Sequence, residues 1–105
     1  MLGEFEQVLL LAILRIGENA YGIPIRDEIR DCTGRDVTLG AIYKTLGRLA
    51  EKGFVTATTG APTPVRGGRR TRCYSVTAAG RRSIRESVRG LRKLTAGLDL
   101  RFDAR

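Results

Sequence analysis

The sequence has 105 residues, of which 42% are hydrophobic, and a net charge of +8. A chain of this length normally forms one domain around a single core, and this hydrophobic fraction argues against a disordered protein. The longest apolar run, Val8 to Leu14, is far too short to span a bilayer. The first residues also lack the basic leader of a secretory signal, so we expect no membrane partner.

The excess of positive over negative charge lies in the second half of the chain. Residues 1–53 contain 7 Lys or Arg and 8 Asp or Glu, a net charge of −1. Residues 54–105 contain 12 and 3, a net charge of +9. Because the basic residues are concentrated in this way, they indicate a directed contact with an anion rather than general solubility.

The reactive residue types are few. The chain has no histidine, and its cysteines are Cys32 and Cys73 alone. Neither a zinc site nor a disulfide framework is expected from this set, and we predict no metal and no cofactor. We expect both cysteines to be small buried residues of a protein in the reducing cytoplasm. Without a histidine, a metal cluster or a converging carboxylate pair, we also expect no enzyme.

The first half of the chain predicts three helices. Apolar residues at spacings of three and four predict a helix over Glu4 to Ile16, whose apolar face is so wide that part of it should meet a partner. A second helix is predicted over Tyr21 to Thr33, ended by Gly34. The third is predicted over Thr38 to Lys52, with Thr38 as its N-cap.

A β-hairpin should follow the third helix. Gly53 can take a left-handed cap position, after which Phe54 to Thr59 is rich in β-branched residues and predicts a strand. Gly60 to Arg70 contains three glycines and two prolines, which predicts a long loop. Thr71 to Val76 is predicted to return as the second strand.

A last helix is predicted from Ala78 to near the end of the chain, with Thr77 as its N-cap. Its apolar residues follow a heptad pattern, which a helix packed on its own domain or a dimer contact could explain. We favour the dimer contact, because the pattern continues beyond the surface that a small domain offers. The heptad positions are Ile84, Val88, Leu91, Thr95, Leu98 and Phe102.

Together these elements predict a mainly α fold with a β-hairpin wing. Residues 1–76 would form a winged helix-turn-helix DNA-binding domain, and residues 77–105 a C-terminal dimerisation helix, in one continuous compact unit. The third helix would enter the major groove of DNA, while the arginines of the hairpin loop would contact the backbone or the minor groove. The predicted DNA contacts are Thr38, Gly40, Tyr43, Lys44, Arg48, Arg69, Arg70 and Arg72.

These residues have different expected tasks. Lys44 and Arg48 would supply charge in the groove, and the Thr38 hydroxyl lies at a helix N-terminus, where it suits a phosphate oxygen. Tyr43 has two interpretations of equal weight, a hydroxyl contact to phosphate or a ring packed on the edge of the core. Gly40 would let the helix backbone approach the DNA closely.

Several ordered motifs resemble those of PadR-family transcriptional regulators, over roughly Leu2 to Leu94. They are Tyr21-Gly22-Ile23, Leu39 to Leu46, Lys52-Gly53-Phe54-Val55, Gly68-Arg69-Arg70, and Tyr74 to Gly80. The resemblance implies a winged helix-turn-helix repressor that is dimeric through its N- and C-terminal helices. By position, Tyr43 matches the tyrosine of the family's recognition helix. The dimer contacts expected on this basis are Phe5, Leu9, Ile84, Val88, Leu91 and Leu98.

The chain departs from the family at two points. Many members have proline after the recognition-helix tyrosine, whereas this chain has Lys44, so the local contacts should differ. Some short members hold flat drugs between tryptophans at the dimer interface, but this chain has no tryptophan. A small-molecule effector, its identity, and the choice between repressor and activator are left open by the sequence.

The function predicted first is therefore a homodimeric, sequence-specific DNA-binding repressor that reads an inverted repeat in double-stranded DNA. One alternative is a non-specific nucleic-acid-binding accessory protein, for which aromatic stacking residues on an exposed sheet would be needed. The other is a protein-interaction module whose basic loop binds an acidic partner.

Overall fold

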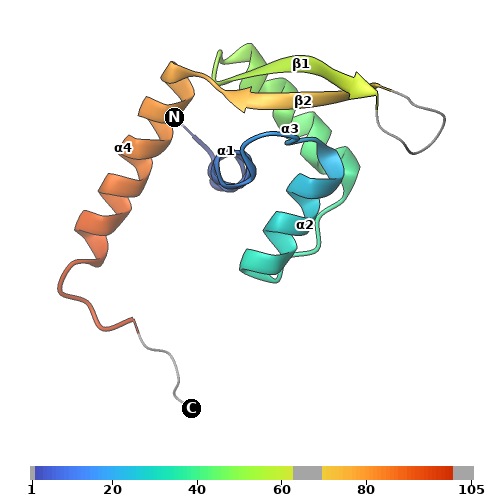
Figure 1. Ribbon diagram of the computed structural model, residues 1–105. Helices are drawn as coiled ribbons and strands as arrows, with labels where there is room; N and C mark the ends of the chain where they lie inside the picture. The colour runs from blue at the N-terminus through green and yellow to red at the C-terminus, as the bar shows by residue number, and fades with distance from the viewer. Residues whose placement is uncertain (1, 63–69, 101–105) are drawn as a thin grey trace.

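The computed structural model describes residues 2–62 and 70–100 (Figure 1). Within these ranges the chain forms helices and one antiparallel two-stranded hairpin, so the predicted fold class is confirmed. None of the described helices is long and apolar enough to cross a membrane. In chain order the elements are α1 (Glu4–Ile16), α2 (Gly22–Thr33), α3 (Leu39–Glu51), β1 (Val55–Pro62), β2 (Arg70–Val76) and α4 (Ala78–Thr95).

Helix α1 is the centre of the core. It lies beneath the hairpin, with α2 and α3 on one side of it and α4 on the other (Figure 1). The apolar stripes predicted for the first three helices meet here, and burial of such side chains is the main favourable contribution to folding. The largest side chains with almost no exposed surface are Leu9, Leu10, Ile13, Ile25, Ile29, Ile42, Leu46 and Leu49.

The predicted ends of α3 are confirmed. Thr38 is the N-cap, and its Oγ1 accepts a hydrogen bond from the Ala41 amide at 3.0 Å. At the other end Gly53 has a φ of +78°, a left-handed conformation that favours glycine. The Phe54 amide donates to the Leu49 carbonyl at 2.9 Å, which completes the Schellman motif.

The hairpin is longer than predicted. Val55 pairs with Val76 and Ala57 with Tyr74, but β1 continues to Pro62 and β2 begins at Arg70. The prediction that the loop begins at Gly60 was wrong, because a register irregularity between Thr59 and Pro62 lets pairing continue through this segment. Pro62 ends β1 opposite Arg70, and proline is tolerated there because both strands of a two-stranded sheet are edge strands.

The wing, α3 and α4 meet at one junction. The Thr77 hydroxyl donates to the Gly53 carbonyl at 2.6 Å and accepts from the Gly80 amide at 3.0 Å. The Thr77 amide donates to the Phe54 carbonyl at 2.9 Å. The predicted N-cap therefore also fixes where α4 leaves the hairpin.

Helix α4 ends at Thr95 and does not continue toward the chain end as predicted. Ala96 is extended, with φ −60° and ψ 129°, and Gly97 has a φ of +82°. A glycine that can adopt this conformation ends the helix, so Leu98 lies beyond it. The heptad positions that remain on α4 are Ile84, Val88, Leu91 and Thr95, and Phe102 lies outside the described residues.

The expectation that both cysteines are buried was wrong. Cys32 is exposed near the end of α2, and Cys73 is only half-buried. The Cys32 thiol lies 3.3 Å from Glu28 Oε2, and this hydrogen bond together with partial desolvation raises the pKa of the thiol. Neither cysteine is among the side chains that form the buried core.

Candidate nucleic-acid interface

Helix α3 has two distinct faces. Ile42, Leu46 and Leu49 are completely buried against α1 and α2, and Thr45 is 5% exposed beside them. The opposite face is exposed to solvent and carries the residues that were predicted from the sequence to enter the major groove of DNA. The exposed residues of this face are Gly40, Ala41, Tyr43, Lys44, Gly47 and Arg48. A helix with one such free face can enter the major groove of DNA, which is wide enough to admit it.

The N-terminus of α3 keeps a donor for an anion. Thr38 is exposed, and its Oγ1 is the acceptor in the bond from Ala41. The hydroxyl hydrogen is therefore still available to donate to a phosphate oxygen, next to the unpaired amides of the first helical turn. This geometry is compatible with the phosphate contact predicted for Thr38.

Tyr43 lies at the edge of the core, and its contact to phosphate stays a prediction. Its ring is 45% exposed, yet a Cβ added to Gly22 would clash with the Tyr43 hydroxyl and ring. The side chain thus lies against the first residue of α2, on the edge of the helix pair, with almost half of its surface free. A larger residue at position 22 would have to displace the tyrosine side chain.

Two ion pairs connect the ends of α3 to the first turn of α1. Before α3, the Arg35 guanidinium donates to both carboxylate oxygens of Glu4, at 3.0 and 2.8 Å, and lies 5.4 Å from the centre of the Phe5 ring. After α3, Lys52 Nζ donates to both oxygens of Glu6, at 2.9 and 2.8 Å. These contacts join the first turn of α1 to the segment between α2 and α3 and to the C-cap of α3. They were not predicted from the sequence, because each joins residues more than thirty positions apart.

Glu6 is unusual because it is a carboxylate that is only 7% exposed. Burial raises its pKa, but the hydrogen bonds from Lys52 and from the Gly3 amide, with the charges of Lys52 and Arg48, outweigh burial. The pKa is consequently lowered from its ordinary value of 4.5, and the group is ionised in the folded protein at neutral pH.

A pH-dependent stability should follow from this pair. A lowered pKa in the folded state contributes stability above the ordinary value of 4.5 that is lost as the pH falls through the folded pKa. We expect Glu6→Gln to lower the free energy of unfolding by about 1–2 kcal/mol at pH 7, since a hydrogen bond to a charged group is lost. The difference from the wild type should shrink below pH 4.5.

Urea unfolding at pH 7 and at decreasing acid pH measures this difference. Glu18→Gln is the matched control, because Glu18 is exposed and has no ion pair among the described residues. A Glu6→Gln variant whose deficit stayed constant with pH would contradict the assignment of the stability to this carboxylate.

Three arginines of the wing were predicted to contact DNA, and the structure describes the side chain of one of them. Arg72 is exposed on β2, opposite Thr59 on β1. Arg70 is the first residue of β2, and nothing of its side chain is described. Arg69 lies outside the described residues. The DNA contacts of Arg69 and Arg70 therefore stay predictions from the sequence.

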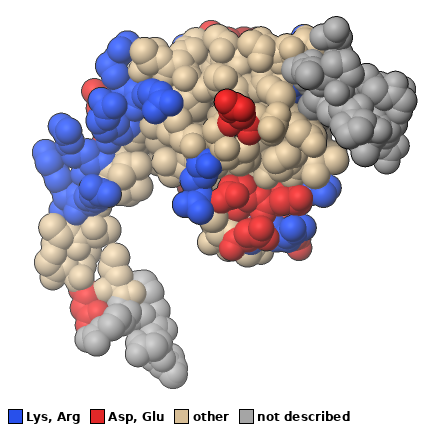
Figure 2. Space-filling view, viewed as in Figure 1, with Lys and Arg blue, Asp and Glu red and all other residues tan. Residues whose placement is uncertain are grey.

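The charge separation expected from the sequence is visible on the surface. Lys and Arg gather along α4, whereas Asp and Glu gather below the centre of the view, in the region of α2 (Figure 2). Along α2 and the neighbouring elements the charges compensate each other, as in the Arg15–Glu28 pair at 2.6 Å. Within the described span of α4, only Glu86 opposes the basic residues.

Several predicted dimer residues belong to the core of the single protomer. Leu9 is completely buried and Ile84 is 4% exposed, so within one protomer both pack mainly in its own core, and their role in a dimer stays a prediction. Phe5 and Val88 are partly buried against the core. Leu11 and Leu94 were not predicted, because a wide apolar stripe does not reveal which positions stay outside. The exposed large apolar residues of α1 and of the C-terminal segment are Leu11, Leu91, Leu94, Leu98 and Leu100.

Comparisons with solved structures show the same fold in proteins of low sequence identity. The complex structure of hsRosR-S4 is 21% identical with a TM-score of 0.68, and the alignment covers 93% of this chain and 77% of that chain. A PadR-family regulator from Eggerthella lenta DSM 2243 is 22% identical with a TM-score of 0.68, covering 90% and 82%. One from Clostridium difficile R20291 is 18% identical with a TM-score of 0.65, covering 89% and 95%.

Sequence comparison identifies the family. No curated protein matches the chain. The profile of the transcriptional regulator PadR-like family matches residues 10–86, from α1 through the first half of α4. Because this match covers most of the chain and includes every element of the helix-turn-helix and the described wing, the resemblance predicted from the motifs is confirmed: the chain belongs to the PadR-like family of transcriptional regulators.

Proposed function

We propose that this regulator is a homodimeric repressor that binds an inverted-repeat operator. The observation that carries the proposal is the open face of α3, which combines Lys44 and Arg48 with the small residues Gly40 and Gly47. Small residues let a helix backbone approach the floor of the groove, and the two cations can donate to base edges there. The buried stripe of Ile42, Leu46 and Leu49 supports this, since it holds the opposite face of α3 against the core.

The remaining contacts would hold the protein on the duplex. Thr38 would donate to a phosphate at the N-terminus of α3. Tyr43, whose side chain is partly exposed, would contact a neighbouring phosphate through its hydroxyl. Arg69, Arg70 and Arg72 of the wing would grip backbone phosphates or enter the minor groove. Binding should then weaken steeply with salt, as counterions are released when phosphates are neutralised.

The exposed leucines support self-association. Leu91 and Leu94 on α4 are 54% and 74% exposed, and Leu11 on α1 is 41% exposed. Leu91 and Leu94 are three positions apart and share one face of α4, and an exposed apolar face favours a protein partner. A second copy is the partner proposed, because a two-fold dimer presents two α3 helices to two half-sites of opposite orientation. Occupation of such a site beside a promoter is the basis of the proposed repressor role.

Selection of bound sequences from a random DNA pool tests the proposal. We expect an inverted repeat whose half-sites are about one helical turn apart. Gel-shift titrations of that sequence should give one complex with two protomers per duplex and an affinity that falls with salt. Binding that is indifferent to sequence would instead favour the non-specific accessory protein, and binding indifferent to both salt and sequence would exclude both functions.

A further inference from the structure

The basic residues of α4 form a stripe along one side of the helix. At about 100° of rotation per residue they fall within an arc of about 120°, over about 18 Å of the helix axis. All of them are exposed, and Figure 2 shows Lys and Arg gathered along this helix. The residues of this α4 basic stripe are Arg81, Arg82, Arg85, Arg89, Arg92 and Lys93.

The α4 basic stripe carries a single sign of charge, unlike the surface of α2. Glu86, beside the edge of the stripe, is the one acidic residue of α4. In α2, each of the two arginines is followed in the chain by an aspartate. A face that serves only solubility carries both signs interspersed, so a stripe of one sign indicates a contact with an anionic surface.

The spacing of the charges matches the backbone of a nucleic acid. Six charges along about 18 Å of helix correspond to about one charge every 3 Å. Each strand of a DNA duplex carries one phosphate about every 3.4 Å along the axis. Five of the six residues are arginines, whose guanidinium groups donate two parallel hydrogen bonds to a phosphate. A row of phosphates therefore offers a partner to successive residues of the stripe.

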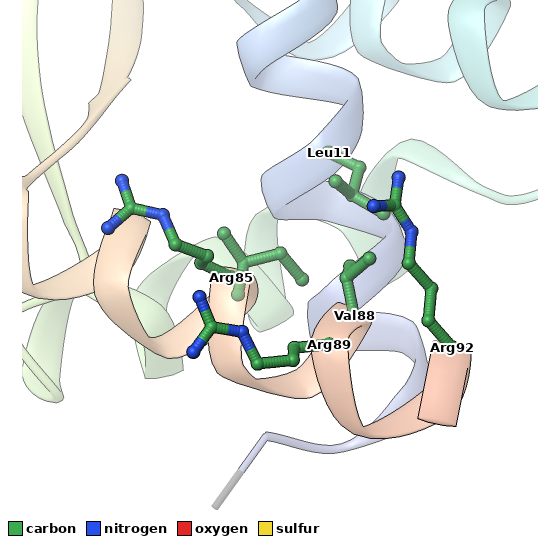
Figure 3. A pocket seen from close by; sticks show the side chains of 6 residues that line it. Leu11, Arg85, Val88, Arg89 and Arg92 are labelled. Carbon is green, nitrogen blue, oxygen red and sulfur yellow. The ribbon is translucent and has the colours of Figure 1, made fainter. Parts of the chain in front are cut away.

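The stripe is separated from the open face of α3. Helix α1 lies between α4 on one side and α2 and α3 on the other (Figure 1). Arg85, Arg89 and Arg92 border the groove between α1 and α4. Figure 3 shows the Arg85 and Arg89 side chains leaving α4 in the same direction, while Arg92 extends toward Leu11 of α1. The stripe is thus a surface of its own and not an extension of the α3 face.

The exposed leucines of α4 project from the other side of the helix. Leu91 and Leu94 lie roughly 140° and 160° around the axis from the middle of the stripe. Self-association through these leucines would therefore leave the stripe accessible.

We propose that the α4 basic stripe binds the phosphate backbone of a second segment of double-stranded DNA while α3 and the wing hold the operator. This contact reads no sequence, because phosphates carry no sequence information. One bound protein would then hold two stretches of DNA together. DNA is favoured over an acidic protein because its phosphates repeat at the spacing of the stripe. The inference rests on the proposed function only for the operator that occupies α3.

A two-duplex capture assay with the full-length protein tests the second contact. Operator duplex on beads is saturated with protein, which occupies α3 and the wing, and a labelled duplex of unrelated sequence is then added. The wild type should retain the second duplex. Arg85→Gln with Arg89→Gln should retain about tenfold less per bound protomer, since two charge-assisted contacts are lost, while gel shift shows unchanged operator binding.

Arg26→Gln with Arg30→Gln is the matched control. These arginines are four residues apart on α2, as Arg85 and Arg89 are on α4, and the variant loses the same charge. It should capture the second duplex as the wild type does. Equal losses in the two double variants would mean attraction by net charge alone and would overturn the proposal. Capture that survived loss of the stripe would mean bridging by the two α3 helices of a dimer, and would overturn it as well.

Poly-L-glutamate in place of the second duplex tests the other kind of partner. The beads should retain it much less than DNA at the same concentration of charge. Equal retention would indicate an acidic protein surface as the partner and would overturn the assignment to DNA.

Binding to an unrelated duplex alone separates failure of the stripe from failure of the proposed function. If no operator exists, the proposed function fails, but the slope of this affinity against salt should still fall by about 2 in the stripe variant and not in the control. Equal slopes would overturn the inference. If circular dichroism shows that the double variant does not fold, Arg89→Gln and Arg30→Gln give the same comparison, with an expected difference in slope of about 1.

Discussion

Replacing Lys44 and Arg48 together by alanine should weaken binding to the selected operator by about a hundredfold or more, because removing one side chain from a base edge costs about 1–3 kcal/mol. Binding to unrelated DNA should change much less. Both side chains lie on the open face of α3 and neither packs in the core, so the variant should fold as the wild type does. Gel-shift titration of operator and scrambled duplexes at one salt concentration measures the two affinities.

The wing gives the matched comparison for this prediction. Replacing Arg69 and Arg70 by alanine removes the same number of positive charges from residues proposed to contact the backbone. Affinity should fall on all sequences alike, and the slope of affinity against salt should decrease by about 2, one unit for each phosphate contact. Equal, sequence-blind losses in the two double variants would refute the division between a helix that selects the sequence and a wing that holds the duplex.

The ends of α3 and the start of α4 could be predicted from the sequence because local interactions determine them. Thr38 and Thr77 each cap a helix through a bond to an amide three residues later. Gly53 and Phe54 end α3 through bonds to carbonyls within the preceding turn and a half. Such interactions are decided by residues close together in the chain, and a sequence displays them directly.

The features that could not be predicted from the sequence depend on contacts between segments that are far apart in the chain. Glu6 and Lys52 are 46 residues apart, and nothing near either residue indicates that they meet. In α1, Leu9 and Leu11 both belong to one wide apolar stripe, yet Leu9 is completely buried and Leu11 is 41% exposed. Which side of a broad stripe is covered follows from the packing of α2, α3 and α4 around it, not from the periodicity of α1 itself.

Gly80→Ala is expected to lower the free energy of unfolding by about 2–3 kcal/mol, the cost of forcing an extra group into a packed site. A Cβ at this position would clash with the Phe54 carbonyl oxygen and would lie 2.8 Å from Val76 Cγ1. The carbonyl cannot easily move away, because it accepts the hydrogen bond from the Thr77 amide at 2.9 Å. The added methyl group must therefore displace α4 from the hairpin.

Gly90→Ala makes the same substitution later on α4 and should have the opposite effect. A Cβ there meets no atom within 4 Å, and alanine is favoured over glycine in a helix by about 0.5–1 kcal/mol. Urea unfolding of the two variants should give midpoints on opposite sides of the wild-type value. If both variants were stabilised, the close approach of α4 to the Phe54 carbonyl would be refuted, and with it the junction that sets the wing relative to α4.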